Sequence, residues 1–219
     1  MKATETVNLY RKALLSNNTQ IDVTDFGAGS RVFKGNRRVV ADIAAKAGIS
    51  GKRGALLSKT IRYFKPATIL EIGTSLGIST AYMASAAPEA KIYSLEGCPA
   101  IASLAKHQFA EFNFTNIDVV VGEFSQTLPS VLKNKTYDLV YFDGNHQKEP
   151  TLAYFLQCLK AAHEDSVFIF DDIHWTRPME EAWMDIKNHP SVTVSVDTFS
   201  WGIVFFRKGQ VKQHFRLRI

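Results

Sequence analysis

Short apolar runs alternate with helical patterns along the chain from Thr68 onward, and this rhythm limits the fold more than any other feature. The runs are TILEIG, KIYSLE, IDVVVG, YDLVYFDG and SVFIFDD, and a segment with helical spacing follows each of them. Residues 167–170 are apolar at every position, as in a strand that is covered on both faces. This alternation predicts an α/β fold built on a doubly wound, mostly parallel sheet.

The pattern changes after residue 190. SVTVSVDTF and WGIVFFRK are strand-like runs with too few residues between them for a crossover helix, so they predict an antiparallel hairpin at the end of the sheet. The C-terminal tail VKQHFRLRI alternates between polar and apolar residues and predicts an edge strand with one solvated face. The polar residues of the tail's solvated face are Lys212, His214, Arg216 and Arg218.

Length and composition favour one main domain with an N-terminal extension. The 219 residues are 46% hydrophobic, which is enough for one sizeable core. We expect residues 1–50 to form a helical extension, or cap, and residues 51–219 to form the main domain. The cap contains a basic loop with Arg31, Lys34, Arg37 and Arg38. We interpret this loop as solvated rather than as a binding patch.

No segment predicts a membrane span or a disulfide framework. The N-terminal segment has no long apolar stretch, and no later window approaches the ~20 apolar residues that a span needs. We therefore expect a soluble, cytoplasmic protein without a membrane partner. Cys98 and Cys158 lie among apolar neighbours and are interpreted as buried small hydrophobes. The net charge of +5 permits a nucleic-acid partner without requiring one.

The segment ILEIGTSLGIST, residues 69–80, combines a strand, a glycine turn and the start of a helix. Such a turn aims backbone N–H groups and the positive end of a helix at a bound anion. Gly73 and Gly77 allow the chain to approach a ligand closely. Their spacing differs from the G-x-G-x-x-G of dinucleotide-binding enzymes, which disfavours an NAD-dependent dehydrogenase.

Two acids near this turn favour a ligand that has a cationic end, which suits Glu71, and a ribose, which suits Glu96. Glu71 precedes the first glycine, and Glu96 ends the next strand, where a doubly wound fold places the acid that binds a ribose. S-adenosylmethionine has a positive amino group and sulfonium, a carboxylate and a ribose. The carboxylate can use the helix N-terminus near Ser79, and the ribose can use Glu96. The alternative is that both acids only cap their strands.

Five motifs in order, LEIGTSLGIST, YSLEGCP, VVGEFSQTLP, DLVYFDGNH and FIFDDIHW, resemble the class I S-adenosylmethionine-dependent methyltransferases. Within that class the chain is similar to the metal-dependent, small-molecule O-methyltransferases of the catechol O-methyltransferase type and their bacterial relatives. The resemblance runs from about Gly51 to Phe206. It implies a Rossmann-like sheet of seven strands, the last of them antiparallel, in agreement with the hairpin inferred above.

The resemblance also implies where the cofactor binds. It places the methionine part at Glu71, Gly73 and Ser79, the ribose at Glu96, and the adenine at Glu123, Phe124 and Ser125. The remaining cofactor contacts that we predict are Thr74, Ser75, Gly77, Gly122 and Asp143.

Three carboxylates follow predicted neighbouring strands at their C-terminal ends. These are Asp143, Asp171 and Asp172. Open α/β sheets place their sites at this edge, and three converging acids repel one another unless a cation or protons intervene. Mg²⁺ or another divalent cation would suit such oxygen ligands. The resemblance implies that all three hold a metal, although Asp172 stands where the best-known family member has Asn. The alternative for Asp172 is that it caps the N-terminus of a helix and does not bind a metal.

A base is required to take a proton from the acceptor in this chemistry. The best-known family member has a catalytic lysine three residues after the first metal-binding aspartate, and this chain has His146 at that offset from Asp143. We therefore predict that His146 and Asp143 are catalytic, with His174 and Lys148 as competing bases. Trp175 and Trp201 either wall the acceptor pocket or pack in the core.

The sequence thus predicts an S-adenosylmethionine-dependent methyltransferase that acts on an oxygen of a small hydroxylated molecule, with divalent-metal assistance. One alternative is an RNA or protein methyltransferase with the same cofactor domain, although the acidic strand ends disfavour a nucleic-acid partner. A non-catalytic module that binds the cofactor is the other. The N-terminal extension and the edge strand are candidate surfaces for a homodimer.

Overall fold

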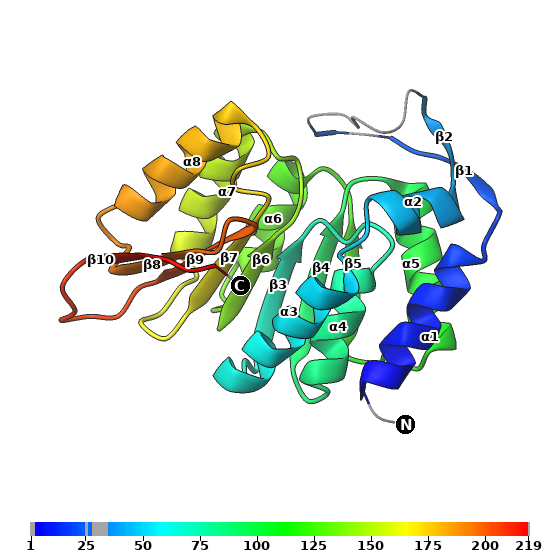
Figure 1. Ribbon diagram of the computed structural model, residues 1–219, viewed down its shortest axis with the longest axis horizontal. Helices are drawn as coiled ribbons and strands as arrows, with labels where there is room; N and C mark the ends of the chain where they lie inside the picture. The colour runs from blue at the N-terminus through cyan, green and yellow to red at the C-terminus, as the bar shows by residue number, and fades with distance from the viewer. Residues whose placement is uncertain (1–2, 25, 28–34, 219) are drawn as a thin grey trace.

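The computed structural model describes residues 3–24, 26–27 and 35–218, and its centre is a mostly parallel sheet (Figure 1). The strands are β1 (Gln20–Asp22), β2 (Arg37–Val39), β3 (Thr68–Ile72), β4 (Lys91–Glu96), β5 (Ile117–Val121), β6 (Leu139–Phe142), β7 (Val167–Asp171), β8 (Val194–Asp197), β9 (Trp201–Phe205) and β10 (Gln213–Arg216). Eight of them form the main sheet in the order β10-β8-β9-β7-β6-β3-β4-β5. Strands β5, β4, β3, β6 and β7 are parallel, and β9 runs antiparallel to β7 and β8.

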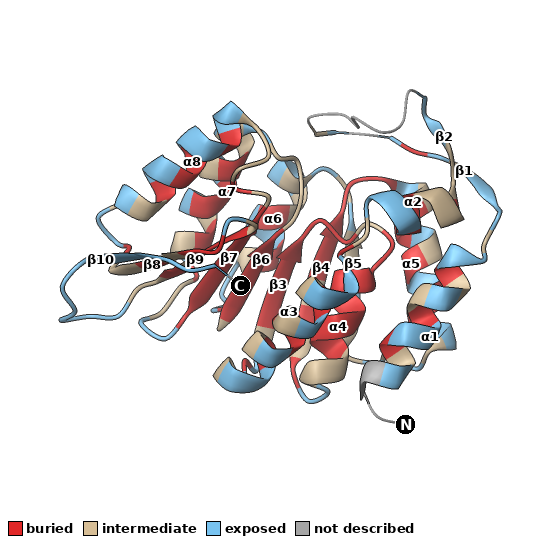
Figure 2. Ribbon diagram, in the orientation of Figure 1, coloured by how far each residue is buried: buried red, intermediate tan, exposed pale blue. Residues whose placement is uncertain are grey.

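Helices cover both faces of this sheet, as the doubly wound prediction requires. They are α1 (Ala3–Leu15), α2 (Val40–Lys46), α3 (Gly51–Phe64), α4 (Ile78–Ala86), α5 (Pro99–Glu111), α6 (Phe124–Leu132), α7 (Lys148–Leu159) and α8 (Arg177–Asn188). Buried side chains of α1 to α5 form one apolar core with one face of the sheet, and those of α6 to α8 form a second core with the other face. The central strands are buried along most of their length (Figure 2).

The predicted fold class and the C-terminal hairpin are confirmed, but the sheet has one strand more than the seven expected. The additional strand, β10, pairs in parallel with β8 at the edge of the sheet. The tail was expected to have one solvated face, and that expectation is wrong, because all four residues of β10 are exposed, including Phe215. The reason is position: β10 lies beyond the strands that the helices cover (Figure 1).

The N-terminal part consists of α1, the small antiparallel β1–β2 sheet and α2. Helix α1 packs against α4, and the hydroxyl of Tyr10 donates a buried hydrogen bond of 2.7 Å to the carbonyl oxygen of Leu76 in the glycine turn. The β1–β2 pair was not predicted. Arg31 and Lys34 of the basic loop lie outside the described residues, and the boundary at residue 50 stays a prediction. Within the described part of the chain, no helix is both long enough and apolar enough to span a bilayer.

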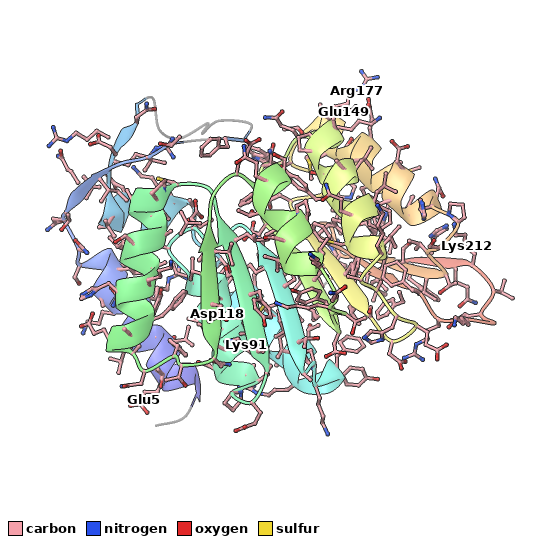
Figure 3. All side chains as sticks on the ribbon, turned by 180° about the vertical axis from the view of Figure 1, so that it is seen from behind. Glu5, Lys91, Asp118, Glu149, Arg177 and Lys212 are labelled. Carbon is pink, nitrogen blue, oxygen red and sulfur yellow. The ribbon has the colours of Figure 1, made fainter. Side chains whose placement is uncertain are left out.

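The two ends of the parallel strands differ in character. At the N-terminal ends of β4 and β5, Lys91 and Asp118 form an ion pair of 2.7 Å on the surface (Figure 3). Exposed pairs of this kind contribute little to stability. The C-terminal ends, by contrast, carry buried or half-buried acids, and this is the edge at which open α/β sheets place their sites.

Candidate active site

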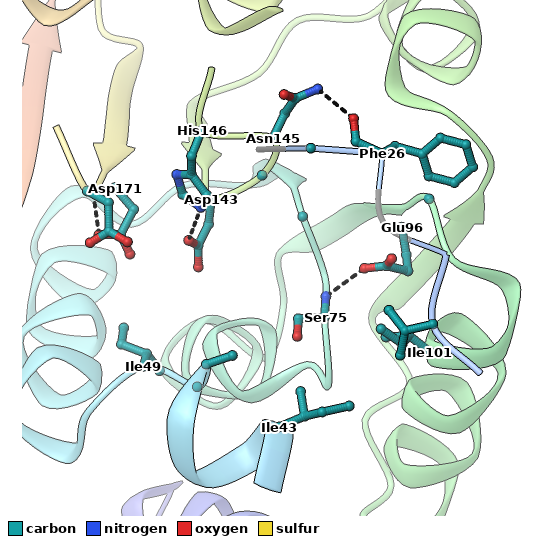
Figure 4. Close-up of a pocket in the computed structure, with 18 of the residues that line it drawn as sticks. Phe26, Ile43, Ile49, Ser75, Glu96, Ile101, Asp143, Asn145, His146 and Asp171 are labelled. Atoms are coloured by element: carbon teal, nitrogen blue, oxygen red, sulfur yellow. Dashed lines mark hydrogen bonds and ion pairs between the residues drawn. The ribbon is translucent and has the colours of Figure 1, made fainter. Parts of the chain in front are cut away.

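A cavity of about 440 Å³ opens at the C-terminal ends of β3, β4, β6 and β7 (Figure 4). Its sheet side is lined by residues directly at or after these strand ends, namely Gly73, Ser75, Glu96, Asp143, His146, Asp171 and Asp172. Phe124 at the start of α6 and Trp175 also line it. The sequence motifs therefore converge on one cavity, although they are far apart along the chain.

The glycine turn forms the floor of this cavity between β3 and α4. Gly73 has a φ of +108°, and a Cβ atom there would lie 2.3 Å from the carbonyl oxygen of Asp143. Only glycine fits this close passage of two backbones. The turn ends at Gly77, which has a φ of +74° and precedes the first turn of α4. Thr74, Ser75 and Ser79 line a small pocket that adjoins the cavity.

Glu96 fixes the geometry of the turn from the end of the neighbouring strand. Its Oε2 accepts a hydrogen bond of 2.8 Å from the backbone N–H of Ser75, and its Oε1 accepts one of 2.8 Å from the N–H of Cys98. A carboxylate oxygen can accept more than one hydrogen bond, and Glu96 lines the cavity in which a ligand would bind. The assignment of Glu96 to the ribose of S-adenosylmethionine stays a prediction.

Glu71 lies beneath the turn rather than on the cavity wall. Its side chain is fully buried, and Oε2 accepts hydrogen bonds from the hydroxyls of Thr80 and Ser94. Its Oε1 is buried without a hydrogen-bond partner among the described residues. Burial raises the pKa of Glu71 to about 7, with hydrogen bonds from Ser94, Thr80 and Ser79 opposing the rise. Any effect of this acid on a cofactor is therefore exerted from below the turn.

Asp143 and His146 face the cavity together from the loop after β6 (Figure 4). Nε2 of His146 lies 3.7 Å from Oδ1 of Asp143, and the imidazole contacts the ring of Trp175 edge-on at 5.5 Å. Burial lowers the pKa of His146, and Arg53 lowers it further against the opposing charge of Asp172. The imidazole is therefore neutral at neutral pH and able to accept a proton.

Asp143 is held in an acidic environment. Burial raises its pKa well above the ordinary value, and the carboxylates of Asp172 and Glu71 raise it further, while Arg53 opposes them. Burial is thus the main cause, and the neighbouring acids at this edge of the sheet add to it.

Asp171 and Asp172, which the sequence predicts as metal ligands, are paired with Arg53 of α3. Nη2 of Arg53 donates to Oδ1 of Asp171, and Nη1 lies 3.7 Å from Oδ1 of Asp172. Oδ2 of Asp171 accepts the hydroxyl hydrogen of Tyr141 at 2.7 Å, and Oδ1 also accepts the N–H of Asp172 at 2.7 Å. The described residues hold no group of three or more His, Cys, Asp or Glu side chains arranged for a metal ion. This donor set does not fit the predicted metal centre.

The two competing bases point elsewhere. Nε2 of His174 lies 3.0 Å from Oδ2 of Asp197, and its Nδ1 lies 3.3 Å from Oε1 of Glu180, so both ring nitrogens are engaged. Lys148 pairs with Glu181 at 3.2 Å and with Asp185 at 3.3 Å on the outer face of α8. Neither residue lines the cavity, which leaves His146 as the base candidate that does.

The other predicted contacts divide in two groups. Gly73, Ser75, Glu96, Phe124 and Asp143 line the main cavity. Gly77, Gly122, Glu123 and Ser125 do not, and Glu123 accepts a hydrogen bond from the Ser125 hydroxyl on the exposed start of α6. Of the two tryptophans, Trp175 lines the cavity, whereas Trp201 is buried in the core.

One wall of the cavity comes from residues that were not predicted to belong to a site, among them Arg38, which the sequence placed in a solvated loop. Val23, Thr24, Phe26, Arg38, Ile43, Lys46 and Ile49 line it from the N-terminal part, and Arg53 lines it from α3. The backbone carbonyl of Phe26 lies 3.5 Å from the side-chain nitrogen of Asn145 (Figure 4). Of these residues, only Arg53 could have been assigned to the site from its position in the sequence. It lies four residues before Leu57 and eight before Ile61, on the helix face that turns toward the core.

Several known proteins that are similar to this chain in sequence or structure are methyltransferases. A family described as a methyltransferase domain matches residues 70–173. Catechol O-methyltransferase of Mycobacterium tuberculosis (strain ATCC 25618 / H37Rv) is 30% identical over 127 residues, which are 57% of this chain and 56% of that protein. The chain thus matches little more than half the length of this curated relative.

Two solved structures show the same fold. The O-methyltransferase TomG from Streptomyces achromogenes, in complex with SAM, has a TM-score of 0.63 and 22% identity, with coverage of 73% of this chain and 81% of that one. The O-methyltransferase from Bacillus cereus in complex with SAH has a TM-score of 0.63 and 18% identity, with coverage of 93% and 90%.

The matched span contains the glycine turn, Glu96, Asp143, Asp171 and Asp172, which are the residues on which the family resemblance rests. The resemblance inferred from the motifs is therefore confirmed: residues 70–173 match a methyltransferase domain, and the chain is similar to O-methyltransferases.

Proposed function

We propose that this protein transfers a methyl group from S-adenosylmethionine to an oxygen atom of a small hydroxylated molecule. The observation that carries the proposal is the cavity at the strand ends, where the glycine turn and Glu96 face His146 across the same space. The similarity to O-methyltransferases supports both the cofactor and the acceptor atom. The cytoplasmic location and a homodimer stay predictions.

In this proposal, different residues bind the cofactor, accept the proton and position the acceptor. When bound, S-adenosylmethionine supplies a methyl group on a positively charged sulfur, which keeps the bonding electron pair as the methyl leaves. Glu96 accepts hydrogen bonds from the ribose hydroxyls, and the turn at Gly73 and Ser75 holds the methionine part. The neutral imidazole of His146 accepts the proton that the acceptor hydroxyl loses. Trp175 and the N-terminal wall exclude water and hold the acceptor in line, which supplies much of the rate.

The cofactor site is tested by titration calorimetry with S-adenosylmethionine and S-adenosylhomocysteine. Glu96→Ala is expected to weaken binding by about ten- to a hundredfold, because hydrogen bonds to a charged group contribute about 1.5–3 kcal/mol. Glu89→Ala is the matched control, since Glu89 is exposed and lies just before the opposite end of β4.

Three outcomes are distinguishable. Binding that weakens in Glu96→Ala and is unchanged in Glu89→Ala supports the proposed cofactor site. Absence of binding to the wild-type protein would refute the methyltransferase proposal. Binding without turnover on any hydroxylated acceptor would instead favour a non-catalytic cofactor module.

A further inference from the structure

Arg53 places a permanent positive charge inside the acidic cluster of the cavity. It extends from the first turn of α3 to the end of β7, and its side chain is 29% exposed. Its guanidinium also lies 5.7 Å above the ring of Trp201, which is buried beneath it. A guanidinium remains charged at every physiological pH, so this cation is a fixed part of the site.

The carboxylate of Asp171 has little capacity left for another cation. It is only 4% exposed and is hydrogen-bonded to Arg53, to the hydroxyl of Tyr141 and to the N–H of Asp172. A metal ion would have to displace the guanidinium, and a displaced Arg53 would still repel it. Breaking a buried ion pair without replacing its partner is strongly unfavourable.

The guanidinium has donors that the acids do not use. Its Nε is buried and has no hydrogen-bond partner among the described residues, and Nη1 lies 3.7 Å from Asp172, beyond hydrogen-bond distance. Arg53 lines the same cavity as Asp143 and His146. Arg53 therefore adds a positive charge to the lining of the cavity in which the acceptor's proton would be removed, and this charge acts on both Asp143 and His146.

We propose that Arg53 takes the place of a divalent metal ion in this site, so that Asp143, Asp171 and Asp172 bind no metal and methyl transfer needs none. The proposal rests on the proposed function and concerns the acceptor side of the same cavity. In that reaction, the positive charge beside the acceptor oxygen is the guanidinium of Arg53. Its role would be electrostatic, like that of other fixed cations placed where negative charge develops.

The direct test is a titration of the full chain with Mn²⁺ alone. The electron paramagnetic resonance signal of the free ion measures how much Mn²⁺ is bound. The wild-type protein is expected to bind no Mn²⁺ up to millimolar concentration. Arg53→Met removes the charge at similar length and is expected to bind Mn²⁺ at least tenfold more tightly than the wild type. Adding Asp171→Asn to that variant is expected to abolish the gained binding. Arg53→Lys keeps the charge and should exclude Mn²⁺ as the wild type does.

Binding of S-adenosylhomocysteine shows that each variant is folded, and for the wild type it should be equal in EDTA and in Mg²⁺. Micromolar Mn²⁺ binding to the wild type that is lost in Asp143→Asn would overturn the proposal, even if no Arg53 variant folds. So would an Arg53→Met protein that binds S-adenosylhomocysteine but no Mn²⁺. A wild-type protein that binds no S-adenosylhomocysteine refutes the proposed function instead, and thereby this inference with it.

Turnover provides a second readout. With an acceptor from a screen of hydroxylated aromatic compounds, wild-type kcat is expected to be unchanged by EDTA. In Arg53→Met, kcat should fall at least tenfold below that of Arg53→Lys, with the KM for S-adenosylmethionine unchanged. Loss of wild-type turnover in EDTA that Mg²⁺ restores would overturn the inference.

Discussion

Replacing His146 with asparagine is expected to lower kcat by ~10²–10⁴-fold, because a positioned general base contributes about this factor. Asparagine is similar in size but does not accept a proton at neutral pH. The KM for S-adenosylmethionine should change little, since His146 is proposed to act on the acceptor hydroxyl and is not among the predicted cofactor contacts. Initial rates with a hydroxylated aromatic acceptor provide the measurement.

His174→Asn is the matched control for this prediction. His174 is also a partly exposed histidine near the end of β7, but its ring nitrogens are engaged by Asp197 and Glu180 and it does not line the cavity. Its replacement should leave kcat within a few-fold of the wild type. A large fall in kcat for His174→Asn with little effect in His146→Asn would reverse the assignment of the base.

In the wild type, kcat measured against pH should have its acid limb below pH 6.5, because burial lowers the pKa of His146.

Most of the fold could be predicted from the sequence, because the patterns that indicate strands and helices extend over only a few neighbouring residues. The apolar runs that became β3, β4, β5, β6 and β7 each end within a few residues of a predicted boundary. Strand β10 was recognised as a strand, but its surroundings were not, because alternation in the sequence does not reveal whether a neighbouring helix covers an edge strand.

The site was predicted in part, for a related reason. Residues at strand ends, such as Glu96, Asp143 and Asp171, could be brought together from topology alone, since parallel strands end at one edge. The partner of Asp171 could not, because Arg53 lies 118 residues earlier in the sequence. Three acids at one edge indicate that a positive charge is required. They do not indicate whether a metal ion or a side chain provides it.

Glu71 illustrates the energetic cost of building this site. Its carboxylate is fully buried under the glycine turn, with one oxygen hydrogen-bonded to Thr80 and Ser94 and the other without a partner among the described residues. Its pKa rises from 4.5 to about 7, mainly through burial. Between these two pH values the folded protein binds more protons than the unfolded chain. The free energy of unfolding therefore falls as the pH rises through this window.

Glu71→Gln is expected to remove this pH dependence and to stabilise the protein by about 3 kcal/mol above pH 7, since each pH unit between 4.5 and about 7 corresponds to about 1.4 kcal/mol. Below about pH 4.5 the two proteins should be equally stable, because the carboxyl group is then neutral in both states. Urea unfolding at acid and alkaline pH measures the difference, with the exposed Glu89→Gln as control. A wild-type protein that is more stable than Glu71→Gln above pH 7 would show that a buried cation compensates the charge of Glu71.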